Sequence, residues 1–125
     1  MLTHEEKVRV VESYVAGFAK SDPEAVVALF AENATVEDPV GSPAHKGLDA
    51  IRAFYTASMA ASPKLELAGP VRTAADYAAF AFAAVINYGG EKRVDVIDTF
   101  RFDENGKVVE MRAYFGPANM HGFEG

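Results

Sequence analysis

The sequence contains no cysteine, which excludes a disulfide framework, a thiolate nucleophile and a cysteine metal site. Its three histidines, His4, His45 and His121, are far apart in the chain and lack the spacing of metal ligands. A GxSxG nucleophile elbow is missing, and Gly89-Gly90 precedes no predicted helix, so it is not a phosphate-binding loop. These absences predict no metal site and leave few groups that could carry chemistry.

Clusters of basic residues and long apolar runs are also missing. The net charge is −6 and no Lys/Arg cluster occurs, so we expect no nucleic-acid binding. No apolar run reaches membrane-spanning length, and the N-terminal segment MLTHEEKVRV has no signal-peptide pattern. Together with the lack of cysteine, this predicts a cytoplasmic protein that binds no membrane.

What is present fits one globular domain over residues 1–125. Half of the residues are hydrophobic and 24% are charged, which is typical of a folded chain. A domain of this length buries roughly two-thirds of its unfolded surface, so its core can enclose a pocket. No internal repeat or low-complexity segment occurs.

Three helices are predicted in the first half of the chain. Thr3 and Glu6 form a capping box for a helix that runs to about Lys20 and turns Tyr14 inward. A short second helix is expected over Glu24–Phe30, after Asp22 as N-cap and Pro23 at the first position. The third runs from Gly47 or Leu48 to about Ala60, with an inner stripe of Leu48, Ile51, Tyr55 and Met59.

The remaining pattern predicts strands. A short strand spans Thr35–Pro39 and is followed by a loop from Val40 to Gly47. After Pro63 the hydrophobic period becomes two, which predicts strands at Lys64–Thr73, Tyr77–Tyr88, Glu91–Phe102 and Lys107–Phe115. Residues Pro117–Gly125 are interpreted as a tail. The order of elements predicts an α+β fold, with three N-terminal helices packed on one face of a curved, mostly antiparallel sheet.

One strand, KRVDVIDTFRF from Lys92 to Phe102, carries an acid on its apolar face. Alternation places Asp98 with Val94, Val96, Phe100 and Phe102, and places Asp95 on the opposite, mostly polar face. A buried carboxylate is costly unless it is paired or protonated. Asp98 is therefore either exposed or paired with an arginine, or it is an acid kept in an apolar place for a function. Its neighbours Arg93 and Arg101 have the opposite parity.

Three further polar residues are predicted to face the same space. Asp38 shares parity with Val36, although an aspartate before Pro39 is also typical of a solvated turn. Tyr14 and Tyr55 lie on inward helix faces, where a tyrosine can equally be a core aromatic with a satisfied hydroxyl. Two tyrosines and two acids without an inward cation indicate proton chemistry in an apolar pocket.

Several segments resemble a known family along almost the whole chain. They are YVAGF (14–18), ALFAENATVEDPVGS (28–42), IRAFY (51–55), VIDTFRF (96–102) and VVEMRAYFG (108–116). In this order they resemble bacterial steroid Δ5-isomerase, also called ketosteroid isomerase, of the nuclear transport factor 2-like superfamily. The resemblance implies a cone-shaped fold, a homodimer packed through its sheets, and no cofactor.

The resemblance also implies roles for individual residues. Asp38 would be the base, Tyr14 and Asp98 the oxyanion hole, and Tyr55 the residue that orients Tyr14. A carboxylic acid kept neutral to donate a hydrogen bond is a known property of this enzyme family, and here it is carried over to Asp98. A small apolar steroid would contact Val40, Phe54, Phe80, Phe82, Val96, Phe100, Met111 and Phe115. The reaction would move the C5–C6 double bond of a 3-oxo-Δ5-steroid to C4–C5 through a dienolate.

The two acids need different environments in this scheme. Apolar neighbours should raise the pKa of Asp98, while Asp38, at a strand end beside a loop, should remain accessible to water. This chain also departs from some members of the family that it resembles, which have tyrosine in place of Phe30 or tryptophan in place of Phe115.

Two alternatives remain open. One is an epoxide hydrolase or polyketide cyclase of the same fold, although the hydrolase needs an inward arginine and Arg93, Arg101 and Arg112 have the wrong parity. The other is a non-catalytic carrier or adaptor, which needs a pocket but no matched acids.

Overall fold

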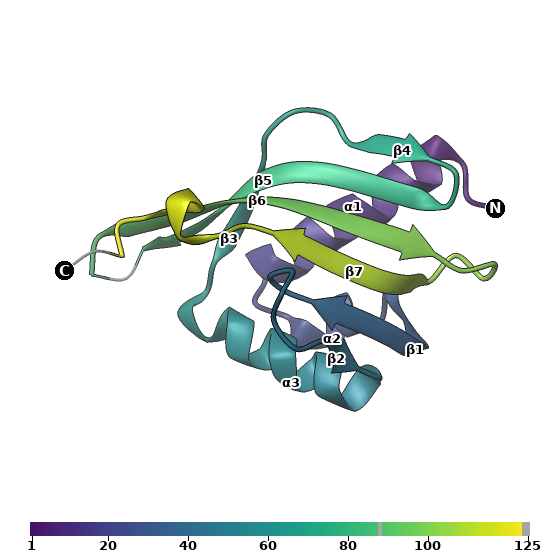
Figure 1. Ribbon diagram of the computed structural model, residues 1–125, viewed down its shortest axis with the longest axis horizontal. Coiled ribbons are helices and arrows are strands. Elements are labelled where there is room, and N and C mark those ends of the chain that lie inside the picture. Colours follow the sequence, from purple (N-terminus) through teal and green to yellow (C-terminus); the bar gives the residue numbers. More distant parts are fainter. Residues whose placement is uncertain (88, 124–125) are drawn as a thin grey trace.

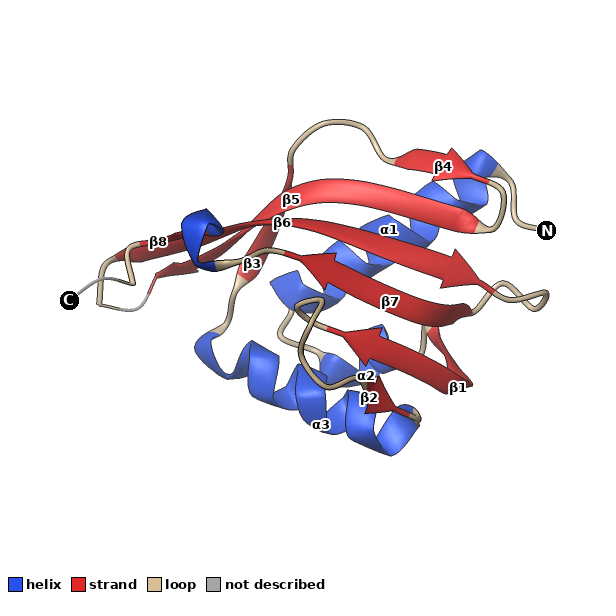
Figure 2. Cartoon of the chain, in the orientation of Figure 1, coloured by secondary structure: helices blue, strands red, loops and turns tan. Residues whose placement is uncertain are grey.

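The computed structural model describes residues 1–87 and 89–123 and has the predicted α+β layout. Helices α1 (His4–Ala19), α2 (Pro23–Val27) and α3 (Leu48–Ser58) pack on one face of a curved sheet (Figures 1 and 2). The described strands are β1 (Phe30–Glu37), β2 (His45–Lys46), β3 (Lys64–Leu67), β4 (Arg72–Ala74), β5 (Tyr77–Asn87), β6 (Glu91–Phe102), β7 (Val108–Tyr114) and β8 (Met120–His121). Their order in the sheet is β2-β1-β7-β6-β5-β3, with β4 beside β5 and β8 beside β6.

The predicted capping box at the start of α1 is confirmed. The Thr3 backbone N–H donates to the Glu6 carboxylate at 2.8 Å, and the Glu6 N–H donates to the Thr3 hydroxyl at 3.1 Å. Both bonds satisfy backbone donors that have no partner inside the helix. The helix thus begins where the sequence predicts, which places Tyr14 on its buried face.

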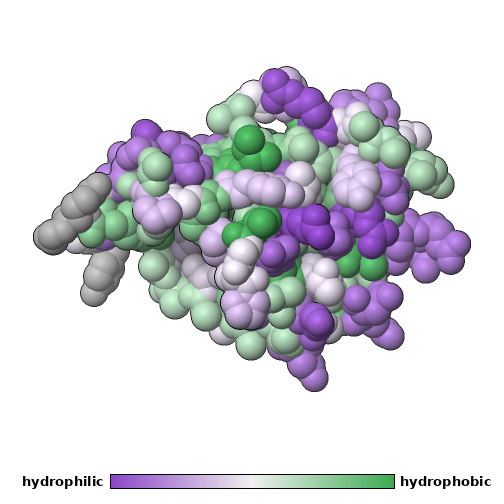
Figure 3. Space-filling model, viewed as in Figure 1, coloured by the Kyte–Doolittle hydropathy of each residue, from purple (hydrophilic) through white to green (hydrophobic). Residues whose placement is uncertain are grey.

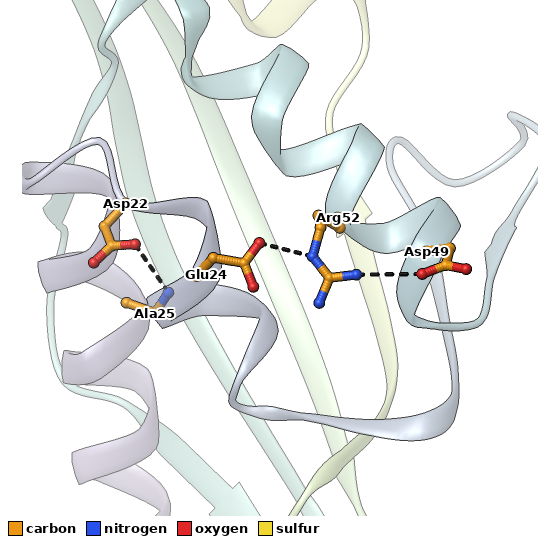
Figure 4. Close-up of polar contacts among 5 residues, drawn as sticks. All are labelled: Asp22, Glu24, Ala25, Asp49 and Arg52. Atoms are coloured by element: carbon orange, nitrogen blue, oxygen red, sulfur yellow. Dashed lines mark hydrogen bonds and ion pairs between the residues drawn. The ribbon is translucent and has the colours of Figure 1, made fainter.

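Helices α2 and α3 are tied together at the surface, as Figure 4 shows. Asp22 caps α2 by accepting from the Ala25 N–H at 3.2 Å. Arg52 of α3 donates to Glu24 of α2 at 2.7 Å and to Asp49 of its own helix at 3.3 Å. These exposed ion pairs contribute little stability each, but they help fix the position of α3, which carries Tyr55.

Several predicted elements differ in the structure. The second helix was expected to reach Phe30 but ends at Val27. The strand predicted over Thr35–Pro39 is β1, which begins at Phe30 and ends at Glu37. The run of apolar residues from Val26 to Phe30 fits a buried helix or a buried strand equally well, so periodicity could not decide. In addition, β1 pairs with β7 in the parallel direction, and β2 forms within the predicted 40–47 loop.

Two further differences lie in the second half of the chain. The strand predicted over Lys64–Thr73 is divided into β3 and β4 around Gly69-Pro70, because proline has no N–H for a sheet ladder. The predicted tail contains a 3-10 turn (Pro117–Asn119) and strand β8, which pairs with β6. The expected end of β5 at Tyr88 and the last two tail residues lie outside the described residues.

The register of the sheet places Asp98 under the helices. Asp98 is directly opposite Phe80 of β5 and Ala113 of β7. Directly opposite residues project to the same face of a sheet, and all three are almost completely buried. The alternation predicted for β6 is therefore confirmed.

Candidate active site

A cavity of about 330 Å³ lies between the helices and the inner face of the sheet. Its polar wall residues are Tyr14, Asp38, Tyr55, Asp98 and Ser58. The other residues of its wall are apolar: Phe18, Phe54, Pro63, Leu65, Phe82, Ala84, Ile86, Val94, Val96 and Phe115. The four polar residues singled out in the sequence therefore share one largely apolar pocket.

Asp98 is the most deeply buried acid of this pocket, with 1% of its surface exposed. Among the described residues neither of its carboxyl oxygens has a hydrogen-bond partner. Burial raises the pKa of Asp98 well above its usual range, and the negative charge of Asp38 raises it further. The nearby Tyr14 hydroxyl lowers this pKa but forms no hydrogen bond with Asp98 in this structure. Burial therefore favours the protonated form of Asp98, and its O–H has no acceptor among the described residues.

Asp38 follows the end of β1 and occupies a less buried position. The turn after Asp38 is attached to β7 by a hydrogen bond from the Val40 N–H to the Ala113 carbonyl at 2.8 Å. Asp38 is half-buried, and burial raises its pKa to about 6. Asp38 is thus more accessible to water than Asp98, as expected, although it is partly desolvated. At neutral pH Asp38 is mostly ionised, and its pKa is close to that of an effective general base.

Tyr14 and Tyr55 are joined by a hydrogen bond between their hydroxyl oxygens at 3.0 Å. They come from α1 and α3, and their rings meet edge to face at a centroid distance of 5.8 Å. Burial raises the pKa of both hydroxyls well above the usual value. Both tyrosines therefore stay protonated and can act as hydrogen-bond donors.

The residues predicted to contact a ligand separate into three groups. Phe54, Phe82, Val96 and Phe115 belong to the wall of the cavity. Phe80, Phe100 and Met111 are fully buried and are not part of this wall; Phe80 and Phe100 pack against the ring of Tyr14. Val40 is 43% exposed and also lies outside the wall.

Several wall residues were missed although their positions carried a signal. Val94 and Ile86 share strand parity with Val96 and Phe82, and Phe18 follows Tyr14 by one helical turn. Pro63 and Ser58 had no comparable signal, because their place depends on how α3 leads into β3. The Ser58 hydroxyl donates to the Phe54 carbonyl at 2.9 Å.

The arginines of β6 and β7 lie on the opposite face of the sheet. Arg93 pairs with Asp95 at 3.1 Å, and Arg112 pairs with Glu37 and Glu110 at 3.5 Å each. Arg101 lies 4.0 Å from Glu110. The described wall of the cavity contains no Arg, Lys or His side chain. Within residues 1–87 and 89–123, no group of His, Asp or Glu side chains could hold a metal ion, and no described helix is long and apolar enough to cross a membrane.

The arrangement can perform proton transfer at a carbon next to a carbonyl group. It offers one ionised base, two tyrosine hydroxyls and one neutral carboxylic acid in an apolar cavity. Donors aimed at an oxygen that gains negative charge act more strongly in such a place than in water. An elongated apolar ligand with a single polar end fits this distribution.

Three comparisons relate the chain to known proteins. The profile of the SnoaL-like domain family matches residues 11–111. The chain is 39% identical over 111 residues to a steroid Delta-isomerase of Nocardioides simplex, covering 88% of this chain and 89% of that protein. A solved structure superposes with a TM-score of 0.88 and 27% identity, over 96% of this chain and 98% of the other. That structure is the epoxide hydrolase/cyclase-like enzyme SalBIII of pyran ring formation in polyether salinomycin.

Proposed function

Because this chain belongs to the SnoaL-like domain family, with the nuclear transport factor 2-like fold, and is a homologue of a steroid Δ-isomerase, we propose that it isomerises a 3-oxo-Δ5-steroid to the conjugated Δ4 isomer. One observation carries the proposal. A single apolar cavity holds Asp38, with a pKa of about 6, and Asp98, whose pKa is raised well above its usual range. A base and a neutral acid can therefore act side by side at neutral pH.

The proposed reaction begins with the ionised Asp38. Its carboxylate removes a proton from C4, the carbon between the carbonyl group and the C5–C6 double bond. The electron pair of that C–H bond moves into the conjugated system, and the carbonyl oxygen becomes the negative oxygen of a dienolate. Asp38, now protonated, returns the proton to C6, and the double bond ends at C4–C5. No cofactor is needed because no electrons leave the substrate.

Tyr14 and Asp98 would stabilise the dienolate oxygen. Burial raises the pKa values of both groups and so favours the protonated forms that can donate. The free O–H of Asp98 can donate to the ligand without breaking a bond to the protein. Oxyanion donors of this kind contribute about 10²–10³-fold in rate each. Tyr55 would orient Tyr14 through their 3.0 Å hydrogen bond.

The test is to add a 3-oxo-Δ5-steroid and follow the absorbance of the conjugated enone. Rapid enone formation that is lost in Asp38→Asn supports the proposal. If a phenol that mimics the dienolate binds but no enone forms, the isomerase proposal fails, and the chain is a ligand carrier or an enzyme with another substrate.

A cyclase is the second candidate, favoured by the close superposition on SalBIII. A hydrolase that uses an inward arginine fits less well, because Arg93, Arg101 and Arg112 all pair with acids on the opposite face. A cyclase could use the same two acids on a hydroxy-epoxide. Asp38 would take the hydroxyl proton as the hydroxyl oxygen bonds to an epoxide carbon, and Asp98 would give a proton to the epoxide oxygen as its bond to that carbon breaks. Cyclisation of a hydroxy-epoxide without any steroid turnover would favour this reading.

We also propose that the protein acts in the cytoplasm as a homodimer packed through the outer face of the sheet. This face is turned toward the viewer in Figure 3, where hydrophobic patches lie between hydrophilic ones. Ile97 of β6 and Tyr114 of β7 are directly opposite each other and are 49% and 44% exposed. They border a hollow of about 590 Å³ that also includes Ala81, Ala83 and Asn119. A second copy would cover this apolar surface.

A further inference from the structure

The pocket has a closed polar end and a more open apolar end. Along the inner face of β6, Asp98 is 1% exposed, Val96 is 7% exposed and Val94 is half-buried. Asp98 and Val94 are four residues apart, which corresponds to about 13 Å along a strand. On the neighbouring strand Ala84 lies directly opposite Val94 and also belongs to the wall. A ligand with its carbonyl group at Asp98 therefore extends toward Val94.

Strand β8 reaches the sheet at this open end. Strand β7 pairs with Ile97–Phe102 of β6. Nearer the start of β6, where β7 no longer pairs with it, β8 pairs with Arg93 and Val94. Met120 lies directly opposite Val94, so its side chain projects to the pocket side of the sheet. Met120 is half-buried and lies outside the buried cluster that forms the core. Met120 thus places an apolar, flexible side chain at the rim of the pocket, outside the core.

Several contacts hold β8 in this position. His121, the neighbour of Met120, projects to the opposite face and lies 3.1 Å from the Asp95 carboxylate. The turn before β8 is closed by the Asn119 side chain, which accepts from the Gly116 N–H at 2.9 Å. After β8 the chain passes so close to β6 that a Cβ on Gly122 would lie 2.5 Å from the Glu91 carbonyl oxygen. The position of Met120 is therefore defined by the fold.

We propose that Met120, presented by β8, is the contact for the end of the ligand remote from Asp98, so that the C-terminal strand selects ligands of steroid length. This inference rests on the proposed function, because it places the ligand carbonyl at Asp98. A four-ring skeleton anchored there extends to Met120, whereas a two-ring compound ends near Val96.

The test compares the binding of two phenols whose hydroxyl groups mimic the dienolate oxygen. The four-ring phenol is equilenin and the two-ring phenol is 2-naphthol, and both dissociation constants are measured by calorimetry. Met120→Ala should weaken equilenin binding about five- to tenfold, because apolar contact area is lost, and should change 2-naphthol binding less than about twofold. Met120→Leu keeps an apolar side chain of similar volume and should retain both affinities within about twofold.

The control variant is Phe123→Ala, which removes an exposed side chain from the same C-terminal segment and should change neither constant. Equal thermal midpoints of the variants would show that β8 remains in place. Equal weakening of both phenols by Met120→Ala, or weakening of neither, overturns the inference. So does failure of the unmodified chain to bind equilenin.

The isomerase assay separates this inference from the proposed function. For a 3-oxo-Δ5-steroid, Met120→Ala should raise KM about as much as it weakens equilenin and leave kcat nearly unchanged. If the phenols behave as expected but the unmodified chain forms no enone, the isomerase proposal fails and the contact at Met120 stands.

Discussion

The hydroxyl oxygens of Tyr14 and Tyr55 lie 3.0 Å apart and join α1 to α3 at the polar end of the pocket. If Tyr55 donates this hydrogen bond, the Tyr14 proton is left for a ligand. In the proposed function the two residues then have unequal tasks, since Tyr14 would touch the ligand oxygen and Tyr55 would position Tyr14.

Substitution of each tyrosine should show this inequality. Tyr14→Phe removes an oxyanion donor and should lower kcat about 10²–10³-fold. Tyr55→Phe removes one neutral hydrogen bond and should lower kcat by about three- to tenfold. Enone formation at saturating steroid measures both. Equal losses in the two variants would mean that Tyr55 is itself a donor to the ligand.

Asp38→Asn should remove proton transfer and retain ligand binding. The amide has nearly the same shape as the carboxylate but cannot accept the proton, so kcat should fall by about 10²–10⁴-fold or more. The affinity for equilenin should be largely kept. The matched control is Glu37→Gln, which changes the neighbouring acid on the opposite face, where it pairs with Arg112. Loss of equilenin binding with turnover preserved would contradict the assignment.

The pH dependence of kcat/KM should report the ionisation of Asp38. Burial raises the pKa of Asp38 to about 6, and the base must be ionised to act. Activity should therefore rise with pH up to about 6 and stay level above it, because the pKa values of Asp98 and Tyr14 lie much higher than usual. Steady-state rates measured at about every half pH unit between about pH 4.5 and 8 would show this rise in kcat/KM. A profile that is level across pH 6, or that falls there, rules out Asp38 as the base.

The buried Asp98 should make folding stability depend on pH. Its pKa is raised in the folded state, so the folded protein keeps a proton that the unfolded chain loses above about pH 4. The stability that this proton contributes is fully present below that pH and is lost as pH rises toward the folded pKa. The free energy of unfolding should fall by as much as about 1.4 kcal/mol per pH unit in that window.

Asp98→Asn should remove this slope. The comparison is made by urea unfolding between about pH 7 and pH 8, above the folded pKa of Asp38, so that Asp38 adds no slope. Asp49→Asn, which changes an exposed acid on α3, should leave the slope as it is. If Asp98→Asn and the unmodified chain have the same slope, the folded protein holds no proton on Asp98 in that pH range.

A charge at the centre of the outer sheet face should weaken self-association. Ile97→Lys places a cation on the exposed apolar surface beside Tyr114, where a second copy would have to desolvate it. Sedimentation velocity should show a dimer for the unmodified chain and a monomer for the variant at micromolar concentration. Leu67→Lys, at a similarly exposed position on β3, serves as control. A monomeric unmodified chain would disprove the proposed dimer.

Much of the candidate site followed from local rules. The capping box fixed the start of α1 and hence the inward face of Tyr14. Strand alternation placed Asp98 inside and Asp95 outside, and the side chain of Asp95 is indeed 48% exposed. These predictions succeeded because helix and strand periods are properties of the backbone and need no knowledge of distant neighbours.

Other features could not be read from the pattern. Phe80, Phe100 and Met111 face inward as expected but are fully buried in the core, where Tyr14 of α1 packs on Phe80 and Phe100. Val94 and Ile86 instead belong to the wall of the cavity. Strand β8 is only two residues long, which is too short for any period to show.

The sequence by itself determined which side chains face inward and that two acids and two tyrosines face the same space. Only the tertiary structure decided how much water each of them meets. Asp38 and Asp98 have the same chemistry and the same inward parity, but one is half-buried with a pKa of about 6 and the other is sealed under the helices. The reason is physical: parity follows from the geometry of neighbouring peptide units, whereas desolvation depends on all the atoms that the rest of the chain brings around a group.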